Sequence, residues 1–190
     1  MSEFVEIRWH ARAGQGAVTA AKALADAATA GGKYVQAFPE YGPERMGAPL
    51  KAYNRVSENP ILIHCQVTSP SIVIIIDQTL IATVNVTEGV ADEGIYIINT
   101  EKSPEELKKK LGVPKAKVYA VDATKISIET IGRSIPNMPI LGVVARATDI
   151  ITVDSVKYQV EKSFGKKFGR SVVEANIKAV DRAYAEVKVA

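Results

Sequence analysis

Residues 4–16 read FVEIRWHARAGQG, and this stretch decides the fold. Its first half alternates apolar and polar residues, which predicts a strand over Phe4 to His10 with Trp9 on the apolar face. Its second half is a glycine loop, Gly14-Gln15-Gly16. A run of small residues over 17–30 then predicts a helix. A strand, a glycine loop and a helix in this order open a layered α/β domain.

Three later segments are continuous apolar runs that end in a polar residue: SIVIIID at 71–77, IYIIN at 95–99 and VYAVD at 118–122. Because these runs do not alternate, both faces of each strand must be buried, as in a parallel sheet covered by helices.

The polar residues at the ends of these runs are Asp77, Asn99 and Asp122. Ligands and partners of open α/β sheets meet the carboxyl ends of the strands, so we expect these residues to share one rim with Gly14. The alternative is that each of them caps the helix that follows it.

The remaining pattern predicts one domain over residues 1–190. Its fold class is α/β, an open, mainly parallel sheet with helices on both faces and a small β excursion. A strand is expected at 34–38, and the excursion is a hairpin of 50–56 with 61–67. Capping boxes are expected at Ser103 and Ser171. Further helices are expected at 124–133, 139–148, 155–164 and from 171 to the C-terminal end.

The composition is that of a globular protein, with 47% hydrophobic residues and a formal charge of +3. One cysteine and two histidines cannot build a structural zinc site or hold an iron–sulfur cluster. The longest apolar run, 72–76, is far shorter than the roughly 20 residues that cross a bilayer. No signal peptide is visible, and the lysine runs are interspersed with acids. We therefore expect a cytoplasmic protein that binds no membrane, no nucleic acid and no metal.

The glycine loop on its own supports two interpretations. Bare backbone N–H groups at a helix N-terminus can bind phosphate, but a tight strand-to-helix turn needs the same glycines. Thr19 stands where the dinucleotide fingerprint has its third glycine, and Lys22 lies too far along for a P-loop.

Two segments together are more specific than the glycine loop. HARAGQGAVTAA at 10–21 resembles the segment that opens the gamma subunit of pyruvate:ferredoxin oxidoreductase. VQAFPEYGPERMGAP at 35–49 resembles the second hallmark loop of that family. The likeness continues to FGKKF at 164–168, so it covers essentially the whole chain. Ala11 and Ala13 replace two family glycines, and Met138 stands where threonine is usual.

The resemblance implies a Rossmann-like subunit of a multi-subunit enzyme. Such enzymes oxidatively decarboxylate a 2-oxoacid, transfer the acyl group to coenzyme A, and pass electrons to ferredoxin or flavodoxin. Thiamine diphosphate, Mg²⁺ and [4Fe-4S] clusters are then expected on the alpha, beta and delta partner subunits, with no cofactor bound by this chain alone. This chain is expected to provide subunit contacts and part of the coenzyme A site.

The candidate positions for coenzyme A or for a subunit interface are Gly14, Gln15, Gly16, Glu44, Arg45 and Asn137. We assign no catalytic residue and no metal ligand to this chain. The Arg45 guanidinium matches the geometry of a phosphate, but an ion pair with Glu44, with Glu40 or with a neighbouring subunit explains it nearly as well.

Two alternatives stay open at this point. The chain can belong to the same family and serve another 2-oxoacid, such as 2-oxoisovalerate or 2-oxoglutarate, because the substrate pocket is expected on other chains. It can also be a stand-alone nucleotide-binding protein in which Glu40, after the second strand, holds a ribose.

Overall fold

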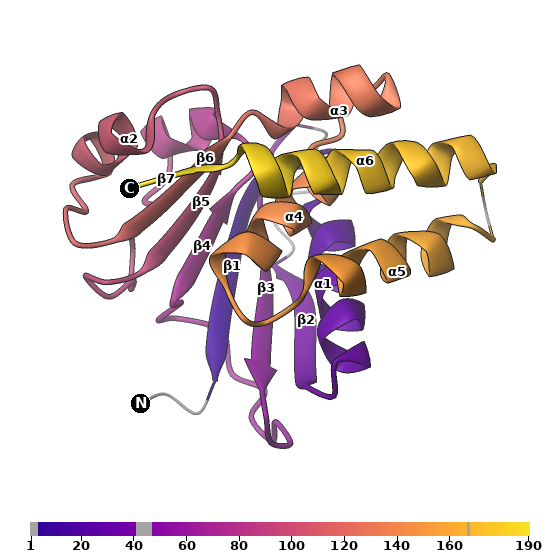
Figure 1. Ribbon diagram of the computed structural model, residues 1–190. Helices are drawn as coiled ribbons and strands as arrows, with labels where there is room; N and C mark the ends of the chain where they lie inside the picture. Colours follow the sequence, from indigo (N-terminus) through magenta and orange to yellow (C-terminus); the bar gives the residue numbers. More distant parts are fainter. Residues whose placement is uncertain (1–3, 41–46, 167) are drawn as a thin grey trace.

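The computed structural model describes residues 4–40, 47–166 and 168–190, and its main feature is one open sheet (Figure 1). Within those residues the sheet has seven strands in the order β2-β3-β1-β4-β5-β6-β7. The strands are β1 (Val5–Arg12), β2 (Tyr34–Glu40), β3 (Pro49–Ser57), β4 (Ile72–Ile75), β5 (Ile95–Asn99), β6 (Lys117–Val121) and β7 (Lys188–Val189).

The sheet is mixed but mainly parallel. Strands β1, β4, β5 and β6 are parallel neighbours, whereas β3 runs antiparallel between β1 and β2. Strand β7 adds a short antiparallel edge beside β6. The expected α/β class with an open, mainly parallel sheet is therefore confirmed.

Helices cover both faces of the sheet, as expected, but unevenly. Five helices pack on one face, and Figure 1 shows α4, α5 and α6 lying together in front of the strands. The other face is covered by α2, the 3-10 helix η1 and the chain between β4 and β5. The helices are α1 (Ala17–Ala30), η1 (Gln78–Ala82), α2 (Pro104–Leu111), α3 (Ala123–Ile131), α4 (Asn137–Ala147), α5 (Val153–Phe164) and α6 (Arg170–Glu186).

The core lies on both sides of the central strands. On β4, Val73 and Ile75 face the α2 side, while Ile72 and Ile74 face the larger helix layer, and all four are buried. The continuous apolar runs thus have the double burial that they predicted.

The predicted β excursion is wrong. Residues 49–57 form β3, which inserts into the main sheet and pairs with β1 and β2 over its length. Residues 61–67 form no strand. Their backbone is bound by side chains instead, since Gln36 Nε2 donates to Ile63 O at 2.8 Å and Arg55 Nη2 donates to Cys65 O at 3.1 Å.

The helix ends follow the expected chemistry at most positions. Ser103 caps α2 by accepting from the Glu106 amide, and Gly112 ends that helix with φ 69°. Only this half of the expected box is formed, because Glu106 Oε1 accepts from Lys102 Nζ at 2.6 Å. The box expected at Ser171 is wrong, because α6 begins at Arg170 with Gly169 as its N-cap residue. A complete capping box is formed at the start of α5, where the side chains of Thr152 and Ser155 each accept a hydrogen bond from the other's backbone amide.

Strand β1 is buried on both faces, which its alternating pattern did not predict. Arg8 and His10 are buried on the face opposite Trp9. They pair with each other, because Arg8 Nε donates to His10 Nε2 at 3.0 Å and Arg8 Nη2 donates to Val86 O at 3.0 Å. Burial and the neighbouring Arg8 charge lower the pKa of His10 to about 3.

The burial of His10 predicts a specific pH dependence. Because its pKa is about 3 in the folded chain and about 6.5 unfolded, the unfolded chain binds an extra proton below about pH 6.5. Folding stability should therefore fall as the pH drops from about 6.5 toward 3, by at most about 1.4 kcal/mol per pH unit from this group. Urea unfolding of the wild type and of His10→Gln at pH 7, 6 and 5 measures the effect. Parallel losses in the two proteins would contradict it.

Candidate functional site

The glycine turn links β1 to α1 at the carboxyl edge of the sheet. Gly14 has φ +100° and Gly16 has φ +80°, conformations that residues with side chains rarely adopt. The Gln15 amide donates to Arg12 O at 3.1 Å and closes the turn. The glycines that signalled the turn are therefore required by its backbone geometry.

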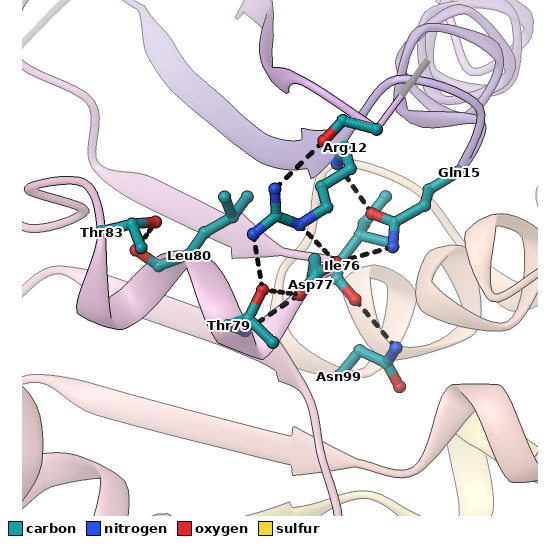
Figure 2. Close-up of polar contacts among 9 residues, drawn as sticks. Arg12, Gln15, Ile76, Asp77, Thr79, Leu80, Thr83 and Asn99 are labelled. Atoms are coloured by element: carbon teal, nitrogen blue, oxygen red, sulfur yellow. Dashed lines mark hydrogen bonds and ion pairs between the residues drawn. The ribbon is translucent and has the colours of Figure 1, made fainter.

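Side chains fix this turn to the end of β4 (Figure 2). Gln15 Oε1 accepts from the Arg12 amide at 2.7 Å, and Gln15 Nε2 donates to Asp77 Oδ2 at 2.8 Å. Arg12 Nε also lies 3.2 Å from that Asp77 oxygen, while Arg12 Nη2 donates to Thr79 Oγ1 at 3.0 Å. The four side chains form one network across two strands.

Asp77 is the acceptor at the centre of this network. Its Oδ1 accepts from the Thr79 amide at 2.9 Å, so it also caps η1. Burial alone would raise the pKa of Asp77, but the hydrogen bonds from Thr79 and Gln15, with the charge of Arg12, lower it below its ordinary value. Asp77 is therefore ionised at neutral pH and holds the Arg12 guanidinium in place.

Arg12 also reaches the second hallmark loop. Its Nη1 donates to Gly47 O at 3.0 Å, and the Gly47 amide donates to Ala13 O at 3.2 Å. The predicted site residues Glu44 and Arg45 lie outside the described residues. The structure nevertheless places Gly47, at the end of their loop, directly beside the glycine turn.

Gly16 and Asn137 were both predicted site residues, and the structure brings them into contact. A Cβ added at Gly16 would lie 2.6 Å from Asn137 Nδ2. Asn137 is buried at the first turn of α4, and its Oδ1 accepts from the Met138 amide at 2.9 Å. Its position indicates that it packs α4 against the start of α1.

The expected rim is formed by Asp77, Asn99 and Asp122, but Gly14 does not line their pocket and its neighbour Gln15 does. Gln15, Asp77, Asn99 and Asp122 line one pocket of about 380 Å³ at the carboxyl ends of the strands, together with Glu101. Three carboxylates in one pocket oppose the entry of phosphate. With Asp77 paired to Arg12, Glu101 and Asp122 still give the pocket a negative lining, which favours exposed Gly14 over the pocket as the place for an anion at the glycine turn.

The alternative role, capping the helix that follows, is confirmed for Asp77 and Asp122 but not for Asn99, because Ser103 caps α2. Asn99 Nδ2 donates to Ile76 O at 2.9 Å and to Thr124 Oγ1 at 2.8 Å, so it joins β4, β5 and α3. Asp122 caps α3 by accepting from the Lys125 amide at 2.8 Å. These hydrogen bonds explain both residues without a ligand.

The alanines that replace family glycines fit their positions. Ala11 is fully buried in β1 opposite Leu50, and Ala13 is held by hydrogen bonds on both sides. Neither has a positive φ. Sequence reasoning missed two residues of the network, Arg12 and Thr79. The signal available for Arg12 was a basic residue two positions before Gly14, with an acid closing the next parallel strand.

The ribose-binding role considered for Glu40 does not fit the sheet. β3 separates β2, which carries Glu40, from β1, so Glu40 does not follow the strand next to the glycine turn. Its carboxylate accepts from the buried Tyr53 hydroxyl and lies near Lys51 Nζ. The dinucleotide-binding geometry is therefore not formed.

The described parts of the chain contain neither a metal-binding cluster nor a membrane-spanning helix. No group of three His, Cys, Asp or Glu side chains there could hold a metal ion. None of the helices in these parts has both the length and the apolar character that crossing a membrane requires.

The fold and site define a class: an α/β domain with a braced glycine turn at the carboxyl edge and, among the residues described, no metal-binding group. The family model for pyruvate ferredoxin/flavodoxin oxidoreductase matches residues 6–186, and the chain belongs to this family.

Relatives agree over nearly the full length. The chain is 47% identical to pyruvate synthase subunit PorC of Thermotoga maritima, covering 98% of this chain and 96% of that one. It is 46% identical to the pyruvate/ketoisovalerate oxidoreductases common subunit gamma of Pyrococcus abyssi, covering 97% and 98%. The crystal structure of the Thermotoga maritima pyruvate oxidoreductase subunit superimposes with a TM-score of 0.87 at 43% identity, covering 100% of this chain and 99% of that one.

Alanine substitutions separate the two roles of the turn glycines. Gly14→Ala should cost about 1 to 2 kcal/mol of folding free energy, because only the backbone is strained and the added methyl meets open space. Gly16→Ala should cost more, about 2 to 4 kcal/mol, because its methyl also collides with Asn137. Urea unfolding gives both values.

The control is the same substitution in an Asn137→Ala background. There the added cost of Gly16→Ala should fall toward that of Gly14→Ala, since the collision with the Asn137 amide group at 2.6 Å is removed and only the contact with Cβ at 3.3 Å is left. Equal costs for the two glycines in the wild-type background would contradict the contact, and so would an unchanged cost in the Asn137→Ala background.

Proposed function

We propose that the chain is the gamma subunit of a multi-subunit 2-oxoacid:acceptor oxidoreductase of the pyruvate type. The complex oxidatively decarboxylates pyruvate to acetyl-CoA and CO₂ and passes the electrons to ferredoxin or flavodoxin. The observation that carries this proposal is the match to gamma-type subunits over nearly the whole of both chains.

The proposal divides the labour among subunits. Thiamine diphosphate with Mg²⁺, and the [4Fe-4S] clusters, belong to the alpha, beta and delta subunits. One cysteine in the whole sequence does not suit a cluster that needs four thiolates. The same proposal places the complex in the cytoplasm. This chain supplies contact surface to its partners.

In this proposal, the partner subunits determine which 2-oxoacid the complex uses. The Pyrococcus abyssi relative is named as a subunit common to pyruvate and ketoisovalerate oxidoreductases. A subunit shared by two enzymes does not distinguish their substrates. By the same reasoning, this chain serves pyruvate or another 2-oxoacid according to the partner chains that bind it.

We also propose that the edge around the glycine turn forms part of the coenzyme A site. Exposed Gly14 has open space around it, and Gly47 anchors the hallmark loop beside it. Three carboxylates line the rim pocket, and the nearby Arg12 is already engaged by Asp77, which favours the loop as the source of a cation for the phosphate. Arg45 is the candidate cation, and Gly14, Gln15, Gly16 and Glu44 are the other candidate positions for the site.

Reconstitution tests the subunit role. The purified chain alone should show no pyruvate-dependent reduction of ferredoxin, and activity should appear only when its partner subunits are added. Co-purification from the native cell should recover those subunits, identified by mass spectrometry. Decarboxylase activity of the single chain would overturn the proposal, and so would recovery of the chain without partners.

Replacement of Arg45 tests the coenzyme A contact. In the assembled complex, Arg45→Ala should raise the KM for coenzyme A about tenfold or more, because a charge-assisted bond worth about 1.5 kcal/mol or more is lost. The KM for pyruvate should stay the same. Arg170→Ala is the control, since Arg170 is an exposed arginine paired only with Glu174 among the described residues. An unchanged KM for coenzyme A would remove the proposed contact.

A further inference from the structure

A groove on the large helix layer has no role in the site above. It lies between α1 and α5, with α4 beneath it, and has a volume of about 550 Å³. Its floor consists of side chains that are almost fully buried: Met138, Leu141, Val156 and Val160. The groove is therefore deep and apolar at its base.

The rim of the groove combines exposed apolar and cationic side chains. Val18 is 41% exposed and Phe168 is 52% exposed, so both present apolar surface to solvent at the edge of the groove. Lys22, Lys162 and Lys166 stand around them. Asp26 is the one acidic residue that lines the groove.

The three lysines make no ion pair within the described residues, unlike Lys157 and Arg182 of the same helix layer. Lys157 pairs with Asp181 at 3.1 Å, and Arg182 pairs with Glu129 at 2.8 Å. Lys22, Lys162 and Lys166 make no ion pair with any residue in the described part of the chain. The groove thus presents uncompensated positive charge around an apolar base.

The shape of the groove favours a polypeptide over a small anion. Val18 to Asp26 spans about 12 Å along α1, roughly two helical turns. The lysines stand apart along this length, on α1, on α5 and beyond its end. The buried polar side chain of the groove, Gln159, is engaged, because its Nε2 donates to Asp26 O at 3.0 Å. No convergent set of donors for one phosphate is formed by the described residues.

We propose that this groove is the docking site for a segment of another subunit of the oxidoreductase, one that carries apolar side chains flanked by Asp or Glu. The apolar side chains cover Val18 and Phe168, and the acids pair with the lysines. This inference rests on the proposed function, since it requires an assembled complex. Complementary charge of this kind speeds association and fixes the register of the contact.

Charge reversal tests the groove in the reconstituted complex. Lys22→Glu with Lys162→Glu should weaken binding of the chain to its partner subunits at least tenfold at low salt, and the affinity should depend less on salt than in the wild type. Both positions are exposed on helices, where Glu and Lys have similar propensities, so the variant should fold. The control is Lys109→Glu with Lys110→Glu on α2, across the sheet, which changes the net charge equally and should leave the affinity unchanged.

Hydroxyl-radical footprinting gives a second readout that needs no variant. Phe168 should lose most of its reactivity when the free chain enters the complex. Two results would overturn the docking proposal without touching the proposed subunit role. One is assembly of the charge-reversed variant with wild-type affinity, and the other is full reactivity of Phe168 in the complex. Failure of the wild type to assemble would overturn both.

A small-molecule occupant is the remaining outcome. The free chain would then gain thermal stability from coenzyme A or from a long-chain fatty acid, used as separate probes, and the gain would vanish in Lys22→Glu with Lys162→Glu. That result, together with normal assembly of the variant, would overturn the docking proposal.

Discussion

The close approach of α4 to the start of α1 is the constraint on which the helix layer depends. Because Gly16 has no side chain, Asn137 can occupy the space beside the glycine turn. Met138, the residue after Asn137, is buried in the core, and Val18, two residues after Gly16, lies on the rim of the groove. A side chain at position 16 would therefore disturb the turn and the groove together.

Local patterns predicted the parts of the fold that depend on local physics. Helix α1 has the bounds that the sequence predicts, 17–30, because glycines flank it on both sides and small residues fill it. The continuous runs at β4, β5 and β6 were recognised because their burial on two faces removes alternation. The position of β3 could not be predicted, since strand alternation does not reveal whether the partner is β1 or the segment at 61–67.

The same limit applies to the site. Gly14 and Gly16 were predictable because a positive φ demands glycine, and Asp77 was predictable because it ends a buried strand. The role of Arg12 depends on three contacts far away in the sequence, at Gly47, Asp77 and Thr79, which no local pattern contains. The alternation in β1 puts Arg8 and His10 on the face opposite Trp9, and only the packing of distant chain over β1 shows that this face is buried too.

The bracing of the glycine turn has a consequence for assembly. Gln15, Arg12 and Asp77 already hold the turn in one conformation within the single chain. A molecule that docks against it loses little conformational entropy from the protein side, so more of the contact energy remains as affinity. The turn is thus already held in place within the single chain, so most of the entropy cost of ordering falls on the molecule that binds there.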